Sequence, residues 1–444
     1  MADVREIINP LKHVRGTFYG WWLVGAATMV MIMASVPLFY GLTAWFPVLE
    51  TRFQWSRAQL SLAFSLSRVE GSVTGPLGGY LTDKLGPRRM VLIGLICLGG
   101  GFVLLGQIQN LWQFYLAFII VSTGAGLGTW LPMMTVLNNW FLSKRATAMS
   151  RAMAGSAAGG ILLVPLLAWS IDPEHFGLDR WRVVSTGLGA VIMFFALPVS
   201  LVIRNRPEDY GQHPDGIQRS QASATPGETG TPQPASDAPG LTWQEALRTR
   251  TFWLMTIGHA CSSAVIVTIS VHLGSMLNLD RGIPLQTVGM VVSTYLGVGA
   301  LFNLVGGYIG DRLPIRMAIF GISALQSVAL GVLLLTDSTP LAFLFGVLLG
   351  ISFGGRSPLT TAIRGIYFGR RAFASIMGMS MVPMNGFMIV LPLFAGYMFD
   401  TTGSYDIPFM VLIVLNLLGS CLFLMLGEPK LMSAAPKTVQ QSRT

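Results

Sequence analysis

Charged residues are scarce in this sequence of 444 residues: they make up 11% of the chain, whereas 52% of the residues are apolar. A soluble globular protein normally has about a quarter of its residues charged, so the composition excludes an ordinary soluble domain. Charge is also missing over long runs, such as those from Arg15 to Glu50 and from Arg89 to Lys144. A membrane-spanning helix needs roughly 20 apolar residues. The first run therefore holds one span and the second holds two.

Cysteine and histidine are scarce as well. Cys97, Cys261 and Cys421 lie in separate apolar runs without CxxC spacing, which is typical of small packing residues. The five histidines form no cluster with metal-ligand spacing, and no G-x-x-x-x-G-K-[ST] loop is present to bind ATP phosphates. No Ser/His/Asp set lies near one membrane face. We therefore expect no metal, no cofactor, no ATP-driven pump and no enzyme.

The apolar runs predict an all-α membrane protein with twelve transmembrane helices. The predicted spans are 18–48, 57–82, 89–107, 111–140, 146–171, 182–203, 251–278, 285–310, 315–336, 339–366, 371–399 and 406–427. The first is about twice as long as the apolar core of a signal peptide, so we expect it to remain in the membrane.

The distribution of Lys and Arg predicts the orientation. If the N-terminus is cytoplasmic, nearly all of the loop and tail cations lie inside, and those outside are only Arg52, Arg57, Arg180, Arg182 and Arg281. Cytoplasmic loops carry such an excess of Lys and Arg, so we expect a multi-pass protein of the cell membrane with both termini in the cytoplasm. The net charge of +9 then reflects orientation and requires no nucleic-acid partner.

A stretch rich in Pro, Ser, Thr and Gly divides the chain into two halves. Residues 205–241 predict a disordered cytoplasmic linker between six-helix bundles at 17–204 and 242–428, with cytoplasmic tails at 1–16 and 429–444. Thr242 and Glu245 have the spacing of a capping box that opens a short surface helix. We expect the protein to be a monomer whose partners are the lipid bilayer and a small solute.

The two halves share a motif. Gly79-x-x-x-Asp83-Lys84-x-Gly86-x-Arg88-Arg89 closes the second predicted helix and opens the third, and Gly307-x-x-x-Asp311-Arg312 repeats it in the second half. Parallel six-helix repeats related by an axis along the membrane normal are typical of transporters that hold a substrate between their halves. The repeat therefore predicts alternating access.

The motif at 79–89 resembles the signature between helices 2 and 3 of the major facilitator superfamily, and Asp311-Arg312 resembles its degenerate copy between helices 8 and 9. Further segments are similar to the branch that holds the oxalate/formate antiporters and the monocarboxylate transporters; these are 181–182, 204–216, 367–371 and 396–405. The likeness covers nearly the whole chain apart from the linker and tails. It implies two six-helix bundles related by pseudo-twofold symmetry, with helices 1, 4, 7 and 10 around a central cavity.

A conformational gate follows from the same resemblance. Asp83 is expected to face the N-terminal end of helix 11, where the helix dipole and Arg371 would hold it. The other expected gate residues are Arg88, Arg89, Asp311 and Arg312. The arginines also agree with the positive-inside rule alone, so a purely topological role stays open for them.

Three charged residues lie deep inside predicted spans, where burial of a charge costs several kcal/mol and usually marks a function. Arg356 follows two glycines in helix 10, which the resemblance places on the cavity wall, and we expect it to anchor an anion, with Arg68 second. A structural role for either arginine remains the alternative. Glu70 is the candidate for proton coupling, because a low-dielectric site favours a neutral carboxyl group. Pairing with Arg68 or Arg151 would instead keep Glu70 ionised.

The remaining expected cavity residues are Tyr40, Trp130, His259 and Asn385, together with methionines of helices 4 and 11 such as Met134 and Met377. Methionines and aromatic residues at this spacing more often form plain packing, and a lone histidine more often has a structural partner. If they face the cavity, they favour a bulky organic acid.

This sequence lacks charged residues that are typical of the branch, and their absence narrows the choice of substrate. Oxalate-type members carry an arginine in helix 8 and a lysine in helix 11, and monocarboxylate members carry an Asp/Arg pair in helix 8, but these helices are uncharged here. The predicted function is secondary transport of a small organic anion, most simply a monocarboxylate, by proton symport or anion exchange. Efflux of hydrophobic or drug-like compounds and a transporter-like sensor without turnover are the alternatives.

Overall fold

The computed structural model describes residues 18–427, except 41, 56, 217–239 and 278–280. In this part the chain is helical, and its β-structure is one isolated bridge between Gly240 and Gly369. The first half contains α2 (Gly20–Ala34), a π-helix η1 (Ser35–Tyr40), α3 (Leu42–Phe53), α4 (Arg57–Leu85), α5 (Pro87–Leu105), α6 (Leu111–Gly128), α7 (Trp130–Trp140), α8 (Arg145–Ser170), α9 (Pro173–Phe176) and α10 (Arg180–Val202). The second contains α11 (Trp243–Leu247), α12 (Arg250–Ser275), α13 (Leu285–Arg312), α14 (Ile315–Leu334), α15 (Thr339–Phe368), α16 (Phe373–Thr402) and α17 (Asp406–Leu424).

The predicted twelve-span architecture is confirmed. Among the described residues, eleven helices are long and apolar enough to cross a membrane. The helix that falls outside this set is α4, whose 29 residues include Arg68 and Glu70. It packs between α6 of its own half and α16 of the other half, so it completes the set of twelve.

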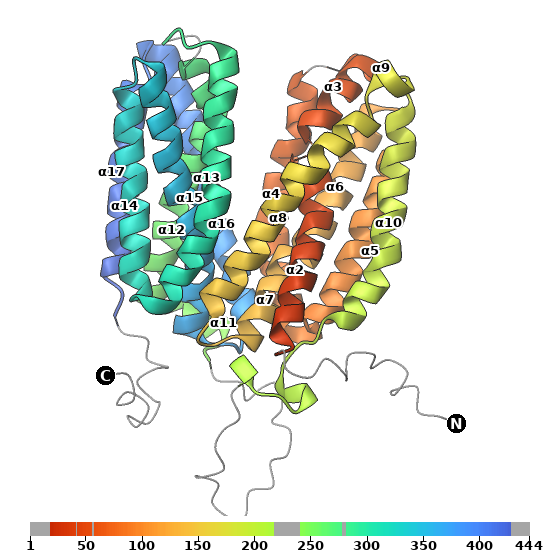
Figure 1. The fold of residues 1–444 in the computed structure, drawn as a ribbon, viewed down its shortest axis with the longest axis vertical. Helices are drawn as coiled ribbons and strands as arrows, with labels where there is room; N and C mark the ends of the chain where they lie inside the picture. Colours follow the sequence, from red (N-terminus) through yellow and green to blue (C-terminus); the bar gives the residue numbers. More distant parts are fainter. Residues whose placement is uncertain (1–17, 41, 56, 217–239, 278–280, 428–444) are drawn as a thin grey trace, which may run out of the picture.

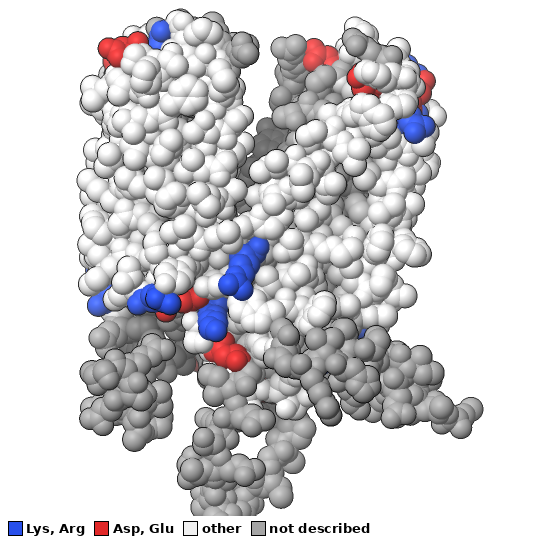
Figure 2. All heavy atoms as spheres, viewed as in Figure 1, with Lys and Arg blue, Asp and Glu red and all other residues white. Residues whose placement is uncertain are grey.

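The helices form two bundles, one from each half of the chain (Figure 1). The bundles meet at the end that carries both chain termini and diverge toward the other end. The space-filling view shows an opening between them at this far end, and a broad belt with few charged residues separates the charged ends of the molecule (Figure 2). Such a belt is what the hydrocarbon core of a bilayer requires.

Two predicted spans are broken in ways that their apolar sequences did not indicate. The span predicted at 18–48 consists of α2, the π-helix η1 and α3, and Trp45 Nε1 donates to the carbonyl oxygen of Pro37 at 2.9 Å. The span predicted at 111–140 breaks at Thr129, whose φ and ψ are −114° and −91°. π-helical segments are often found at functional sites, so the break at Ser35–Tyr40 is a candidate functional feature of its helix.

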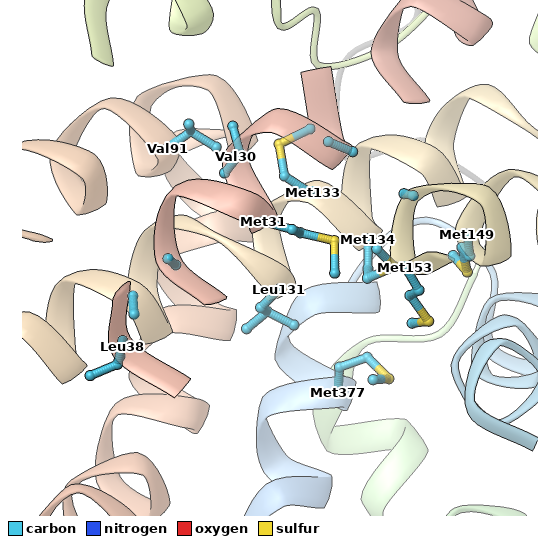
Figure 3. Packing of buried hydrophobic residues seen from close by; sticks show 14 of the residues in the cluster. Val30, Met31, Leu38, Val91, Leu131, Met133, Met134, Met149, Met153 and Met377 are labelled. Atoms are coloured by element: carbon cyan, nitrogen blue, oxygen red, sulfur yellow. The ribbon is translucent and has the colours of Figure 1, made fainter. Parts of the chain in front are cut away.

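The buried apolar residues explain where the halves adhere. One core cluster runs from the first half into the ends of α15 and α16 that lie nearest the termini, whereas a second lies within the C-terminal bundle alone. Methionines fill the junction: Met31, Met134, Met153 and Met377 come from α2, α7, α8 and α16 and lie close together (Figure 3). Flexible thioether side chains suit an irregular interface of this kind.

The segment that joins the halves is partly folded. Residues 205–216, predicted as the start of a disordered linker, include two 3₁₀ turns, Glu208–Tyr210 and Pro214–Gly216, held against the helix ends. The predicted capping box of α11 is confirmed, with Glu245 N–H donating to Thr242 Oγ1 at 3.3 Å and Thr242 N–H donating to Glu245 Oε2 at 2.8 Å. The rest of the predicted linker, 217–239, lies outside the described residues.

Candidate functional site

Arg356 lies near the middle of α15 and is 3% exposed. The two glycines before it allow α15 to approach its neighbours closely: a Cβ atom on Gly354 would collide with the backbone of Gly299 in α13, and one on Gly355 would crowd the side chain of Ile322 in α14. The Nε and Nη1 atoms of Arg356 are buried and have no hydrogen-bond partner in the described part of the chain. An unpaired buried guanidinium is costly, so these donors point to a ligand or to water.

Arg364, two turns further along α15, is a second buried arginine of this site. It is 1% exposed, and its guanidinium donates to the Thr360 carbonyl oxygen and to Ser380 Oγ at 3.3 Å. Sequence reasoning counted Arg364 among the cations at the cytoplasmic surface because it lies two residues before the predicted helix end. The structure instead continues α15 to Phe368 and turns the side chain into the bundle.

His259 of α12 is the third member of the cluster. Its Nδ1 atom lies 3.4 Å from Nη2 of Arg364. A guanidinium can only donate, so Nδ1 is the acceptor and the imidazole carries its proton on Nε2. The alternative expected for a lone histidine was a structural partner. His259 has such a partner at Nδ1, but in the described chain it has none at Nε2.

No carboxylate balances this cluster among the described residues. The charged groups that act on His259 are Arg364 and Arg356, and the charge that acts on Arg364 is that of Arg356. Neither arginine takes part in an ion pair within the described residues. The C-terminal bundle thus holds two buried positive charges without a described counterion, Arg356 near the middle of α15 and Arg364 in its last two turns.

The other predicted cavity residues are placed differently. The side chains of Tyr40 and Arg68 lie outside the described residues. Trp130 opens α7 directly after the break and packs against the buried core. Asn385 of α16 donates to Ser72 Oγ of α4 at 3.1 Å, so it links the two halves. Met134 and Met377 are buried, at 0% and 3% exposure. This burial agrees with the alternative role for these methionines, which was packing rather than lining the cavity.

Glu70 lies in the middle of α4 and accepts a hydrogen bond from Thr123 Oγ1 of α6 at 3.0 Å. Arg151, one of its expected partners, stacks instead on the Trp21 ring at 4.4 Å. No described cation forms an ion pair with Glu70. The carboxyl group is therefore held by a hydroxyl group rather than by a described positive charge.

The closed end of the molecule is joined by two equivalent contacts. Asp83 at the end of α4 accepts from the backbone N–H groups of Ala374 and Ser375 at 3.2 and 2.7 Å, at the start of α16. Asp311 of α13 accepts from Ala146 and Thr147 at 2.9 Å each, at the start of α8. Each carboxylate therefore caps a helix of the opposite half, where the dipole favours negative charge.

The motif glycines permit these caps. A Cβ atom on Gly79 would collide with the carbonyl group of Ala374, and one on Gly307 would collide with Ser150. Each glycine lies one turn before its aspartate and lets the helix approach the opposite half. The repeated Gly-x-x-x-Asp spacing is thus explained by two contacts of the same geometry.

The arginines of the motif do not form the simplest contact within the described residues, an ion pair with the motif aspartate. In the described chain Arg88 and Arg89 form no ion pair with Asp83; the backbone N–H of Arg88 donates to Asn205 Oδ1 at 3.0 Å. The Arg312 guanidinium lies 4.2 Å from the centre of the Tyr308 ring. Arg371 lines the groove that also contains Asp83, and the charge of Arg206 acts on this carboxylate.

The folded start of the linker adds further contacts at the closed end. Glu208 forms a two-point ion pair with Arg370, at 2.7 Å to Nη1 and 2.9 Å to Nη2. Asp215 accepts from the N–H groups of Leu142 and Ser143 at 3.1 and 2.7 Å. Sequence reasoning missed both carboxylates because it assigned this segment to a disordered linker.

Two bundles of six spans, joined at one end by equivalent contacts, define a membrane transporter. Residues 22–285 and 257–443 match the profile of the Major Facilitator Superfamily. The chain belongs to this superfamily, and such transporters are not enzymes.

Named relatives place the chain beside carriers of organic anions. It is 25% identical to monocarboxylate transporter 11 of Mus musculus, over 93% of this chain and 88% of the relative. It is also 25% identical to the oxalate:formate antiporter of Oxalobacter formigenes, over 68% and 67% of the two chains. The crystal structure of FucP in the outward conformation shares the fold, with a TM-score of 0.67, 13% identity, and coverage of 92% and 99%.

Proposed function

We propose that the protein moves a small organic anion, a monocarboxylate, across the cell membrane by alternating access between its two bundles. The observation that carries the proposal is the pair of buried, unpartnered N–H donors on Arg356. A guanidinium donates short, charge-assisted hydrogen bonds to carboxylate oxygens, and the second arginine adds charge without an opposing carboxylate in the described chain. The names of the relatives agree with this substrate class.

The termini and the closed end lie on one side of the molecule, and the distribution of Lys and Arg assigns this side to the cytoplasm. The conformation is then outward-open, and transport requires the Asp83 and Asp311 contacts to separate. Proton symport and anion exchange both remain compatible with the proposal. Glu70 is the proposed proton carrier if symport operates, because no described cation pairs with it.

The efflux alternative depended on a methionine lining of the cavity. Met134 and Met377 instead pack in the junction between the bundles (Figure 3). A neutral lipophilic solute also could not balance the charge of Arg356 or satisfy its free N–H donors. The anion proposal is therefore the one that these residues support.

The test is uptake into proteoliposomes of a labelled panel of mono- and dicarboxylates, with and without a pH gradient. Arg356→Gln is expected to reduce uptake of the preferred anion at least about 10-fold, because each hydrogen bond to a charged group contributes roughly 1.5–3 kcal/mol. Arg248→Gln, which removes an exposed arginine outside the bundles, is the matched control and is expected to transport normally. Full uptake by folded Arg356→Gln protein would overturn the anchor assignment.

A further inference from the structure

The proposed transport mechanism uses only the charge of Arg364, yet this residue is among the largest fully buried side chains of the described chain. Three protein groups hold it: the carbonyl oxygen of Thr360, Ser380 Oγ on α16, and His259 Nδ1 on α12. Each of its three guanidinium nitrogens thus has one protein acceptor. Arg364 is therefore fixed in place, unlike Arg356, whose Nε and Nη1 are free.

The bond to His259 determines the state of the imidazole. While Nδ1 accepts from a guanidinium, the ring can bear only the Nε2 proton. This Nε2–H group has no partner in the described structure, and His259 is partly accessible whereas Arg364 is 1% exposed. The Nε2–H donor of His259 is therefore available to another acceptor.

We propose that Arg364 is a positioning residue of the anion site: it holds His259 neutral, with Nδ1 as acceptor, so that Nε2–H donates to the anion bound at Arg356. The anion then receives hydrogen bonds from two helices, α12 and α15. Arg364 can act in this way only if Arg356 binds an anion, so the inference rests on the proposed function.

The surroundings of His259 support this assignment. Arg356 and Arg364 reach it from α15, and α16 contributes the uncharged Ser380. At this level α17 meets α12 through Gly419 and Phe423, which contact Gly258 and do not titrate. In the described structure the charges that act on His259 are those of the two arginines and not of a carboxylate, so no described charge stabilises an imidazolium.

Two substitutions of the histidine separate the two ring nitrogens. His259→Gln places an amide N–H near the position of Nε2, whereas His259→Asn reaches only the position of Nδ1. We expect binding of labelled benzoate or acetate to the purified full chain to stay within about 3-fold of the parent for His259→Gln. For His259→Asn we expect it to weaken at least about 10-fold, the loss of one charge-assisted hydrogen bond. Equal affinity of the two variants would overturn the role of Nε2–H.

The positioning role of Arg364 is tested by a pH profile. With Arg364→Gln the imidazole loses its fixed acceptor role and can take a second proton. Anion affinity should then acquire a dependence on pH between about 5 and 7, the range in which histidine titrates, in addition to any dependence that the parent shows. The double variant Arg364→Gln/His259→Gln should lose this dependence again. An unchanged profile in Arg364→Gln, or the same new dependence in the double variant, would contradict the proposal.

The outcomes distinguish this inference from the proposed function. If the parent binds neither benzoate nor acetate, or if Arg356→Gln binds as well as the parent, the anion site itself is wrong. If Arg356→Gln loses binding while the His259 and Arg364 variants match the parent, only the positioning role fails. Thermal unfolding of each detergent-solubilised variant identifies any loss that arises from misfolding.

Discussion

At the scale of single residues, the unusual feature is a pair of arginines buried in one helix without a counterion in the described chain. Arg356 is 3% and Arg364 is 1% exposed. Their charges repel each other, and removing an ion from water costs several kcal/mol even after the protein relaxes. Arg364 recovers part of this cost through three protein acceptors. Arg356 recovers little, so a bound anion would stabilise the bundle.

Glu208 gives a prediction about pH at the closed end. Burial raises the pKa of this carboxyl group, but the two-point bond to the Arg370 guanidinium outweighs it, and the pKa lies below its usual value. A group with a depressed native pKa stabilises the folded contact above its unfolded pKa and loses this effect as the pH falls through the native value. We therefore expect the closed end to loosen below about pH 4.

The measurement is the rate of proteolysis in the folded linker start, 205–216, as a function of pH. Glu208→Gln should be cleaved faster than the parent at neutral pH and should show a weaker acceleration on acidification. Asp209→Asn, which removes the neighbouring exposed carboxylate, is the matched control and should behave as the parent does. Identical cleavage of all three proteins at every pH would contradict a stabilising role for the ion pair.

Sequence reasoning found some of these residues and missed others for physical reasons. Arg356 was identifiable because it interrupts a long apolar run at mid-depth, where charge is costly. Arg364 lies two residues before the predicted end of its helix, where a long side chain can reach either water or the interior. Only the tertiary contacts with Ser380 and His259 show that it turns inward.

At the scale of helices, α8 and α16 both begin beneath a carboxylate from the opposite half. Asp83 caps α16 and Asp311 caps α8. Loss of an N-cap costs roughly 0.5–2 kcal/mol. Because each cap exists only while the halves are together, we expect Asp83→Ala and Asp311→Ala to shift the protein toward opening at this end by roughly 2- to 30-fold.

This shift is measurable by the labelling rate of a cysteine introduced at Met153, in a background without the native cysteines. Met153 is 9% exposed and contacts Ser357 of the other half, so its position becomes accessible only when the halves separate. Both cap variants should label faster than the parent. Asp337→Ala, at an exposed position in the loop between α14 and α15, should not; slower or unchanged labelling in the cap variants would refute the role of the caps.

Helix existence could be predicted from sequence, but helix breaks could not. A span of uncharged residues specifies length and burial, whereas the π-helix at Ser35–Tyr40 and the break at Thr129 depend on neighbours. At the second break, a Cβ atom on Gly94 of α5 would collide with the backbone of Gly128. The capping box of α11 was predictable because its two partners lie three residues apart in the sequence.

At the scale of the whole molecule, two halves of one design adhere at one end and separate at the other (Figure 1). The repeated motif predicted this twofold arrangement, and the matching caps of Asp83 and Asp311 show its geometric basis. The open end could not be predicted, because under the proposed alternating-access mechanism one sequence must be compatible with both states. The continuous core at the end with the termini explains which state is present here.

The central claim is that an anion at Arg356 drives exchange between the two states. Double electron–electron resonance between pairs of introduced spin labels tests this claim. One pair is placed at Lys84 and Gln244, which line one groove at the closed end. The other is placed at Trp112 and Leu335, which are exposed at the open end. Adding a transported carboxylate to the parent should populate longer distances for the first pair and shorter distances for the second, and Arg356→Gln should show neither change. Distances that ignore the anion in the parent, or that shift equally in Arg356→Gln, would contradict the account.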